Sequence, residues 1–551
     1  MCHPPPWRQD SGSLHVTRRK TALATATALA AASVVAGAIA VPSAMAEPAD
    51  GTAARQSDTA TKGVRGAAAR AAKEGVNWQE CPADWGLKAP VQCGWVTVPV
   101  DYADPRGDTI KLAVSRLRSS GGKGEHQGSL LYNPGGPGGS GLDFPLGATD
   151  KDGVWAKTSR AYDFVGFDPR GVGHSAPISC VDPKEYAKSP KPDPVPDDEA
   201  DKQAQRKLAQ EYAEGCEERG GALLPHMTTK NTARDLDVIR AALGEKKLNY
   251  LGVSYGTYLG AVYAHLFPGH VRRMILDSVV NPAPEKIWYQ ANLDQDVAFE
   301  GRWNDWKNWV AEHNDAYGLG DSADDVQAAW DELRTTAKEK PLGGKVGPAE
   351  LLSFFQKAAY ADAVWPKVAA ALSAYALGDE QPLVKAAAPD MSDAAKLASD
   401  ENGNAVYTAV ECNDTQWPGD WQQWDKDSER LHAEHPFMTW SNTWMNLPCA
   451  NWPLQHDNKP LDIKPGKKLP ATLILQAERD AATPYEGAVE LHKRLKGSRL
   501  ITEKDAGSHG TSGGTNSCIN DRVDAYLLKG ETGAEDTVCE PHELPEPEQA
   551  K

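Results

Sequence analysis

Apolar residues recur along the first half of the chain in short runs that predict the strands of a β-sheet. Residues 93–102 and 109–117 alternate apolar and polar positions, as half-buried strands do. Later runs are shorter and more uniformly apolar, and loops or helical spacing separate them; they cover residues 129–132, 162–167, 248–253 and 273–280. Two alternating strands followed by strands that alternate with helices predict an α/β fold whose mostly parallel sheet has an antiparallel start.

A long interruption divides this sheet. Residues 282–465 show mainly helical spacing and contain 12 of the chain's 17 tryptophans, which we expect to pack between helices. Strand-like runs return at 471–476 and 500–502, and a helical run follows at 520–528. We therefore predict a core in two parts and an inserted helical cap domain, with the divisions 77–281, 282–465 (cap) and 466–540 and a tail over 541–551.

The N-terminus has the composition of a targeting segment. Arg18, Arg19 and Lys20 precede an uncharged, alanine-rich stretch that ends in a small-x-small sequence at residues 44–46. A retained anchor helix is the alternative, but this stretch is rich in Ala, Thr and Gly rather than Leu and Ile. We predict a signal peptide over residues 1–46, a secreted mature protein, and a disordered linker or pro-segment over residues 47–76.

Charge and motif content limit the partners and cofactors. A net charge of −17 over 551 residues argues against nucleic acid or an anionic membrane as a partner. The sequence contains no CxxC and no HExxH motif, so nothing supports a zinc site. We expect no metal, no cofactor and a monomer.

Cysteine content agrees with export. Eight cysteines follow residue 46, and an even number in an exported chain predicts disulfides. They are Cys81, Cys93, Cys180, Cys216, Cys412, Cys449, Cys518 and Cys539. Neighbours in the sequence would pair as 81–93, 180–216, 412–449 and 518–539, although eight cysteines allow more than a hundred other arrangements.

One run carries the strongest chemical signal. Residues 248–253 form a strand-like stretch that continues into Gly252-Val253-Ser254-Tyr255-Gly256 and then into helical spacing. A strand, the motif Gly-x-Ser-x-Gly and a helix are typical of a nucleophile elbow, in which a strained turn exposes the serine hydroxyl. A second match at residues 510–514 has no strand before it and is interpreted as a loop. Ser254 is therefore the predicted nucleophile of a serine hydrolase.

A serine hydroxyl needs a base, and the base needs an orienting carboxylate. In elbow folds these follow in the order serine, acid, histidine, each after a late strand. Asp480 follows the strand near residue 475, and His509 lies in a small-residue loop after the strand near residue 501. Both positions have rival candidates: Asp277 and Glu478 for the acid, and His174, His265 and His270 for the base.

The oxyanion of the tetrahedral intermediate needs two backbone N–H donors. One is expected from Tyr255, the residue after the nucleophile. The second is expected from the glycine-rich loop at residues 134–138, where Gly136 is the predicted donor.

These motifs together resemble the α/β-hydrolases of the prolyl-aminopeptidase group, and among them the secreted tripeptidyl aminopeptidases of actinomycete bacteria. The resemblance covers roughly residues 78–540. It rests on the runs 133–141, 166–173, 252–256, 411–414, 480–484 and 507–510 and on Asp277. Many prolyl aminopeptidases open the glycine loop with His, whereas Asn133-Pro134 stands here, as in the tripeptidyl branch.

The resemblance implies an α/β-hydrolase fold and exopeptidase action on peptides or proteins with a free N-terminus. Such an enzyme must bind an ammonium group, and acidic residues in the pocket would do so. Glu411 and Asp414 are the substrate-binding candidates, although a solvated turn beside a disulfide is an equally good interpretation of them.

The residues and the resemblance together predict a secreted serine exopeptidase that releases short peptides, expected to be tripeptides, through an acyl-enzyme. A carboxylesterase or lipase on the same fold is the first alternative, because its triad and oxyanion loop would look the same. A prolyl aminopeptidase is the second, and a non-catalytic binding protein on a hydrolase scaffold is a third.

Overall fold

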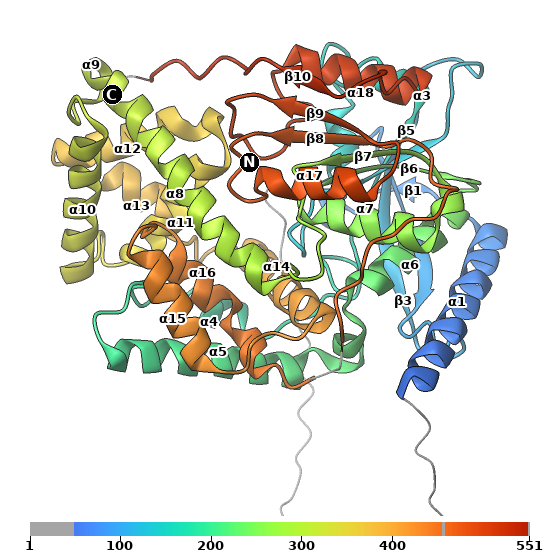
Figure 1. Ribbon diagram of the computed structural model, residues 1–551, viewed down its shortest axis with the longest axis horizontal. Helices are drawn as coiled ribbons and strands as arrows, with labels where there is room; N and C mark the ends of the chain where they lie inside the picture. Colours follow the sequence, from blue (N-terminus) through green and yellow to red (C-terminus); the bar gives the residue numbers. More distant parts are fainter. Residues whose placement is uncertain (1–48, 455–457, 549–551) are drawn as a thin grey trace, which may run out of the picture.

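The computed structural model describes residues 49–454 and 458–548, without the side chains of residues 49–58. The predicted signal peptide lies outside these residues. A ten-stranded sheet in the order β1-β2-β3-β5-β4-β6-β7-β8-β9-β10 forms the centre of the described molecule (Figure 1). Its strands are β1 (Gln79–Glu80), β2 (Gln92–Pro99), β3 (Thr109–Leu117), β4 (Ser129–Asn133), β5 (Asp163–Phe167), β6 (Leu248–Val253), β7 (Val271–Asp277), β8 (Leu473–Ala477), β9 (Arg499–Glu503) and β10 (Thr537–Cys539).

Strand direction divides the sheet into two parts. The pairs β1–β2, β2–β3 and β3–β5 are antiparallel. All pairs from β5 through β4 to β10 are parallel. The predicted fold class, a mostly parallel sheet with an antiparallel start, is confirmed.

Helices cover both faces of the sheet because alternate strand residues point to opposite sides. Leu131 and Val165 belong to one core with α6 (Thr229–Ala242), α7 (Tyr255–Leu266) and α17 (Tyr485–Arg494). Their neighbours Leu130 and Phe164 belong to a second core with α18 (Ser517–Lys529). Strands buried on both faces explain why the sequence runs are uniformly apolar.

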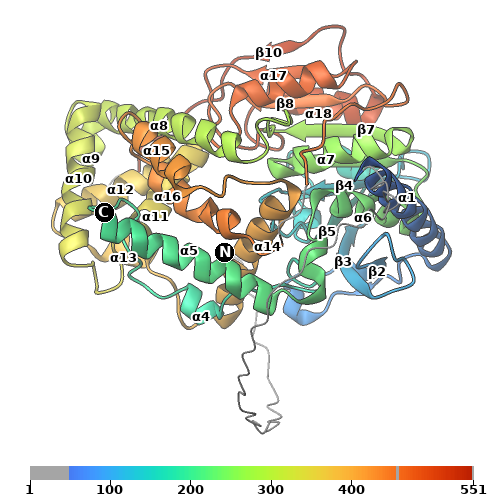
Figure 2. The same ribbon diagram turned by 60° about the horizontal axis from the view of Figure 1, so that its bottom comes forward.

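The chain between β7 and β8 forms a helical layer beside the sheet (Figure 2). Its helices are α8 (Tyr289–Glu312), α9 (Asn314–Tyr317), α10 (Ala323–Glu339), α11 (Pro348–Tyr360), η4 (Asp362–Val364), α12 (Trp365–Ala376), α13 (Gln381–Ala387), α14 (Ala394–Asp414), α15 (Trp421–His432), α16 (Thr439–Asn446) and η5 (Leu447–Asn451). Five of its tryptophans share one buried core: Trp303, Trp306, Trp309, Trp330 and Trp365. We call these helices the cap.

A segment from the first part of the predicted core also packs on the cap. Helix α5 (Glu199–Arg219) contacts α16 and η5. Lys202 on α5 pairs with Asp425 on α15 at 2.7 Å, and the Trp444 indole N–H donates to the Pro194 carbonyl at 2.7 Å. The helical layer therefore uses residues on both sides of β6 and β7 in the sequence.

Within the segment 47–76, which we expected to be disordered, the described residues Ala49–Glu74 form helix α1, which packs on α6. Its contact face consists of small residues at helical spacing that are buried in the main core: Ala60, Val64, Ala67, Ala68 and Ala71. A Cβ on Gly63 would lie 1.9 Å from the Tyr102 carbonyl oxygen, so the approach requires glycine. The expectation of disorder was wrong because a stripe of small residues, mostly alanine, adds little hydrophobicity to the composition yet allows close helix packing; that the segment is a pro-segment stays a prediction.

Four disulfides link the described part of the chain. They are Cys81–Cys93, Cys180–Cys216, Cys412–Cys449 and Cys518–Cys539, the pairs that sequence proximity favoured. Disulfides of this number are typical of an oxidising compartment. Among the described residues, no helix has the length and apolar character needed to cross a membrane.

Candidate active site

Ser254 lies at a sharp turn between β6 and α7. Its backbone has φ 58° and ψ −129°, a conformation that residues other than glycine rarely adopt. A Cβ on Gly252 would lie 2.3 Å from the Gly256 carbonyl oxygen, and one on Gly256 would lie 2.6 Å from the Asn133 carbonyl oxygen. Both flanking glycines are thus required by packing. The run has the strand–turn–helix geometry of a nucleophile elbow.

The sheet order brings the candidate residues together. Strands β6, β7, β8 and β9 are consecutive parallel neighbours, so their carboxyl ends lie at one edge. Ser254, Asp277, Asp480 and His509 all follow or end these strands. Ligands and reacting groups in open α/β sheets gather at this edge.

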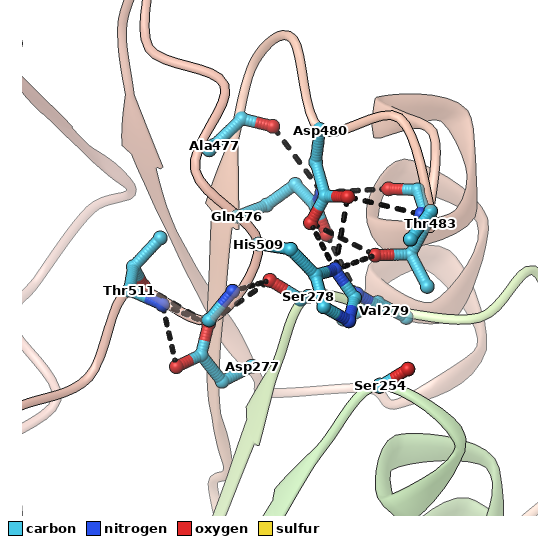
Figure 3. A network of polar contacts seen from close by, with 12 residues as sticks. Ser254, Asp277, Ser278, Val279, Gln476, Ala477, Asp480, Thr483, His509 and Thr511 are labelled. Carbon is cyan, nitrogen blue, oxygen red and sulfur yellow. Dashed lines mark hydrogen bonds and ion pairs between the residues drawn. The ribbon is translucent and has the colours of Figure 1, made fainter. Parts of the chain in front are cut away.

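His509 is bonded to Asp480. Its Nδ1 lies 2.9 Å and 3.0 Å from the two carboxylate oxygens of Asp480 (Figure 3). The Thr483 N–H and hydroxyl each donate to that carboxylate at 3.0 Å and fix its orientation. Burial by itself lowers the pKa of His509, but the charge of Asp480 and the hydrogen bond to it, with Asp277 further away, raise that pKa overall.

In Figure 3 the ring of His509 lies between the Asp480 carboxylate and Ser254. No hydrogen bond joins Ser254 to His509 among the described contacts. Such bonds are often long before a substrate binds.

Asp277 takes part in a different network from the one expected of a catalytic acid. Its carboxylate accepts the main-chain N–H groups and hydroxyls of Thr511 and Ser512 at 2.6 to 3.0 Å. Its carbonyl oxygen accepts the Ser254 N–H at 3.0 Å. Asp277 therefore ties the loop that carries His509 to the elbow strand. The hydroxyl of Ser512, the serine of the second Gly-x-Ser-x-Gly match, is used in this anchor.

Four further acidic and histidine side chains that could have served as acid or base have partners elsewhere. His174 stacks on Trp85 with ring centroids 4.6 Å apart, and His270 Nδ1 lies 2.6 Å from the Asp237 carboxylate. His265 accepts the Lys464 N–H at 3.0 Å. Glu478 accepts the Asp505 N–H at 3.0 Å. None of these contacts involves Ser254.

The glycine-rich loop after β4 packs against the elbow. A Cβ on Gly135 would lie 2.6 Å from the Val253 carbonyl oxygen and 2.8 Å from Ser254 Cβ. Gly135 and Gly136 have φ values of 95° and 105°, which place this backbone in the region that favours glycine. Gly136, Ser254 and Tyr255 line one cavity, as two oxyanion donors and a nucleophile would.

This cavity has a volume of about 670 Å³ and lies where the cap meets the carboxyl edge of the sheet. Its cap side includes residues of α8 and α14. Two of its carboxylates are paired: Asp294 with Lys286 at 2.6 Å, and Asp305 with Arg302 at 2.7 Å. The volume lies in the range of small-molecule pockets.

Glu411 differs from these paired carboxylates. It is buried on α14, lines the cavity, and its Oε2 has no hydrogen-bond partner among the described residues. Burial raises its pKa to about 8, and the nearby charge of Asp414 adds to this, whereas hydrogen bonds from Tyr407 and Asn292 oppose it. A buried carboxyl of this kind is suited to a cationic ligand.

Asp414, the second substrate-binding candidate, does not line the cavity. Its carboxylate accepts the Thr229 N–H at 2.8 Å and the Thr229 hydroxyl at 2.5 Å. That hydroxyl also contacts the Tyr255 hydroxyl at 2.7 Å. Through Thr229, Asp414 therefore fixes the side chain of Tyr255, the first residue of α7. Sequence reasoning missed the cavity residues Trp288, Asn292 and Tyr407; only Tyr407, four residues before Glu411 on α14, had a spacing that could have indicated it.

Comparison with known proteins gives consistent results. The sequence model of the family described as "TAP-like protein" matches residues 435–539. A tripeptidyl aminopeptidase of Streptomyces lividans is 67% identical over 90% of this chain and 92% of its own length. The serine protease Hip1 of Mycobacterium tuberculosis is 32% identical, with 84% and 91% covered, and a carboxylesterase B of that organism is 31% identical, with 84% and 90% covered.

Proposed function

The chain belongs to the tripeptidyl aminopeptidase family of serine peptidases, and on this premise we propose that it removes tripeptides from the free N-termini of peptides and proteins. The observation that carries the proposal is a buried carboxyl group, Glu411, whose Oε2 has no hydrogen-bond partner among the described residues and which lines the same cavity as the elbow serine.

In the proposed reaction Ser254 Oγ attacks the carbonyl carbon of the third residue. His509 accepts the hydroxyl proton, and Asp480 orients the imidazole and stabilises its charged form. The N–H groups of Tyr255 and Gly136 donate to the oxyanion. His509 then protonates the departing amine, and the acyl-enzyme is hydrolysed by a water molecule that His509 activates.

Glu411 binds the substrate's α-ammonium group in this proposal. A charged hydrogen bond in a buried site is strong because little solvent competes with it. A substrate whose amine is acetylated loses that bond and leaves the Glu411 carboxyl unpaired. The distance from Glu411 to Ser254 then selects the number of residues released, since only one peptide length reaches both.

Substrates, partners and location follow from the family, the disulfides and the charge. Peptides are the substrates of the family. The four disulfides support export, and the acidic charge of −17 supports action without nucleic acid or an anionic membrane. A signal peptide over residues 1–46 and a monomeric state complete the proposal.

Two matched substrates test it: a tripeptide with a chromogenic amide leaving group, and the same peptide N-acetylated. We expect cleavage of the free-amine form alone, abolished in Ser254→Ala and retained in Ser353→Ala, which changes an exposed serine on α11. Equal cleavage of both peptides would indicate an endopeptidase. Turnover of simple esters without either amide would support the carboxylesterase alternative, to which one relative's name points.

A further inference from the structure

The C-terminal tail joins the sheet to the cap. Strand β10 ends at Cys539, which is bonded to Cys518 on α18. From there the tail crosses to α9, as Figure 1 shows in red. The Glu548 N–H donates to the Tyr317 hydroxyl of α9 at 3.2 Å. The tail is therefore part of the contact between core and cap.

His542 forms the central contact of this tail. Its Nδ1 lies 2.8 Å from Glu503 Oε1, and its Nε2 lies 3.1 Å from Asp362 Oδ2. Its main-chain N–H also donates to Glu503 at 3.1 Å. Both ring nitrogens face carboxylates, and both can donate only when the imidazole is protonated. The hydrogen bonds to Asp362 and Glu503 outweigh burial and raise the pKa of His542 to about 10.

The two carboxylates belong to the segments that hold the catalytic histidine loop. Glu503 ends β9, the strand that leads into this loop. Asp362 begins η4 of the cap, and its N–H donates to Ser508 Oγ at 3.1 Å. The His509 N–H donates to the Tyr360 carbonyl at 2.7 Å. The loop therefore depends on the cap for two of its bonds.

Other groups hold the two carboxylates as well. Arg302 of α8 pairs with Asp362 and with Asp305, and Arg479 pairs with Asp305. Asn516 donates to Glu503 at 2.6 Å. These are the charged and polar groups around the His542 contacts in the described structure. Because each carboxylate keeps one partner without His542, we expect the fold to survive its loss while the spacing between cap and core relaxes.

We propose that His542 is a positioning residue for His509: its imidazolium holds Asp362 of the cap against Glu503 of the core and thereby fixes the 507–510 loop relative to Ser254. This inference rests on the proposed triad. Misplacing a catalytic group by about 1 Å can lower a rate roughly a hundredfold.

The contact has a defined pH range. A folded-state pKa of about 10 lies above the unfolded value of 6.5, so the stabilising contribution is complete below pH 6.5 and is lost as the pH rises through 10. The contacts of the His542 imidazolium with Asp362 and Glu503 are therefore present at neutral pH and are lost above about pH 10.

The first test uses the intact wild-type protein and a fluorophosphonate, which reports the reactivity of Ser254 and His509 without a substrate amine. We expect the second-order inactivation rate to fall near pH 10 while circular dichroism stays native. A rate that stays constant to pH 11 would overturn the inference. Reaction that persists in Ser254→Ala would instead overturn the proposed nucleophile.

Variants separate positioning from stability. His542→Gln removes the charge and should lower kcat about tenfold or more at pH 7.5, with KM changed less than twofold. His542→Arg should restore kcat and remove the fall near pH 10. Glu543→Gln, an exposed charge removal next to it in the tail, should match wild type. A His542→Gln enzyme with wild-type kcat, or a His542→Arg enzyme with an unchanged alkaline limb, would show that the tail only stabilises the fold.

Discussion

The substitution Glu411→Gln tests the proposed ammonium site most sharply. It keeps the size of the side chain and one carbonyl acceptor, but it removes the charge that would pair with the substrate amine. Losing one partner of a buried, hydrogen-bonded charge pair costs about 2–3 kcal/mol at the lower end of measured values. That loss corresponds to about a 30- to 150-fold decrease in kcat/KM for free-amine tripeptide amides.

The decrease should appear mainly in KM, because the amine lies away from the reacting bond and is bound before and during the reaction. The pH dependence supplies a second readout. Burial raises the pKa of Glu411 to about 8, so raising the pH toward 8 ionises it and lowers KM in the wild type. Above about pH 8 the substrate's own amine loses its proton and KM rises again. In Glu411→Gln the fall in KM below pH 8 should disappear.

Steady-state kinetics of wild type, Glu411→Gln and Glu486→Gln would show whether Glu411 binds the substrate amine. Glu486 also lines the cavity but is exposed, and its neutral variant should behave as wild type. A Glu411→Gln enzyme whose kcat/KM lies within twofold of wild type would refute the assignment of this carboxyl to the amine.

Further predictions concern the oxyanion loop, the disulfides and α1. Gly135→Ala places a methyl group 2.6 Å from the Val253 carbonyl oxygen and should displace the proposed oxyanion loop. With a tripeptide amide as substrate we expect kcat to fall about 100- to 1000-fold, the loss measured when one oxyanion donor is removed. An unchanged kcat would contradict the proposed role of this loop. A reducing agent should lower the thermal midpoint, because each disulfide contributes about 2–4 kcal/mol; an unchanged midpoint together with free thiols in the native protein would refute this. Val64→Asp on α1 should lower the free energy of unfolding, measured by urea denaturation, by roughly 3 kcal/mol, because it buries an unpaired carboxylate. Ala69→Asp, on the exposed face of the same helix, should leave that free energy unchanged. Equal urea midpoints for the two variants and the wild type would mean that α1 contributes nothing to stability.

Sequence patterns predicted most of the core because its strands are buried on both faces and their ends carry distinctive motifs. Ser254, Asp480 and His509 follow strands that the apolar runs predicted, and their order is the one typical of elbow folds. They meet in space because β6, β7, β8 and β9 are neighbours in the sheet. The helix at residues 49–74 was missed because its contact face consists of small residues, mostly alanine, which form no strongly hydrophobic run in the sequence. Its close approach to the core depends on Gly63, which reads in isolation as a helix breaker.

The cap was harder to predict than the core. Glu411 and Asp414 lie three residues apart on one helix, and the sequence gives no means to tell which of them faces Ser254. That choice depends on how α14 packs against Thr229 and Tyr255, which are far away in the chain. The contacts of His542 are equally remote in sequence, with partners 39 and 180 positions away at Glu503 and Asp362. Pairings of this kind are products of tertiary structure alone.

The most direct test of the central claim is the identity of the released products. A nine-residue peptide with a free N-terminus and its N-acetylated twin would be incubated with the purified protein and followed by mass spectrometry. The account predicts that residues 1–3 and then 4–6 of the free peptide appear as intact tripeptides, while the acetylated peptide stays uncleaved. Single residues or dipeptides released from the free peptide, or internal cleavage of the acetylated one, would contradict it.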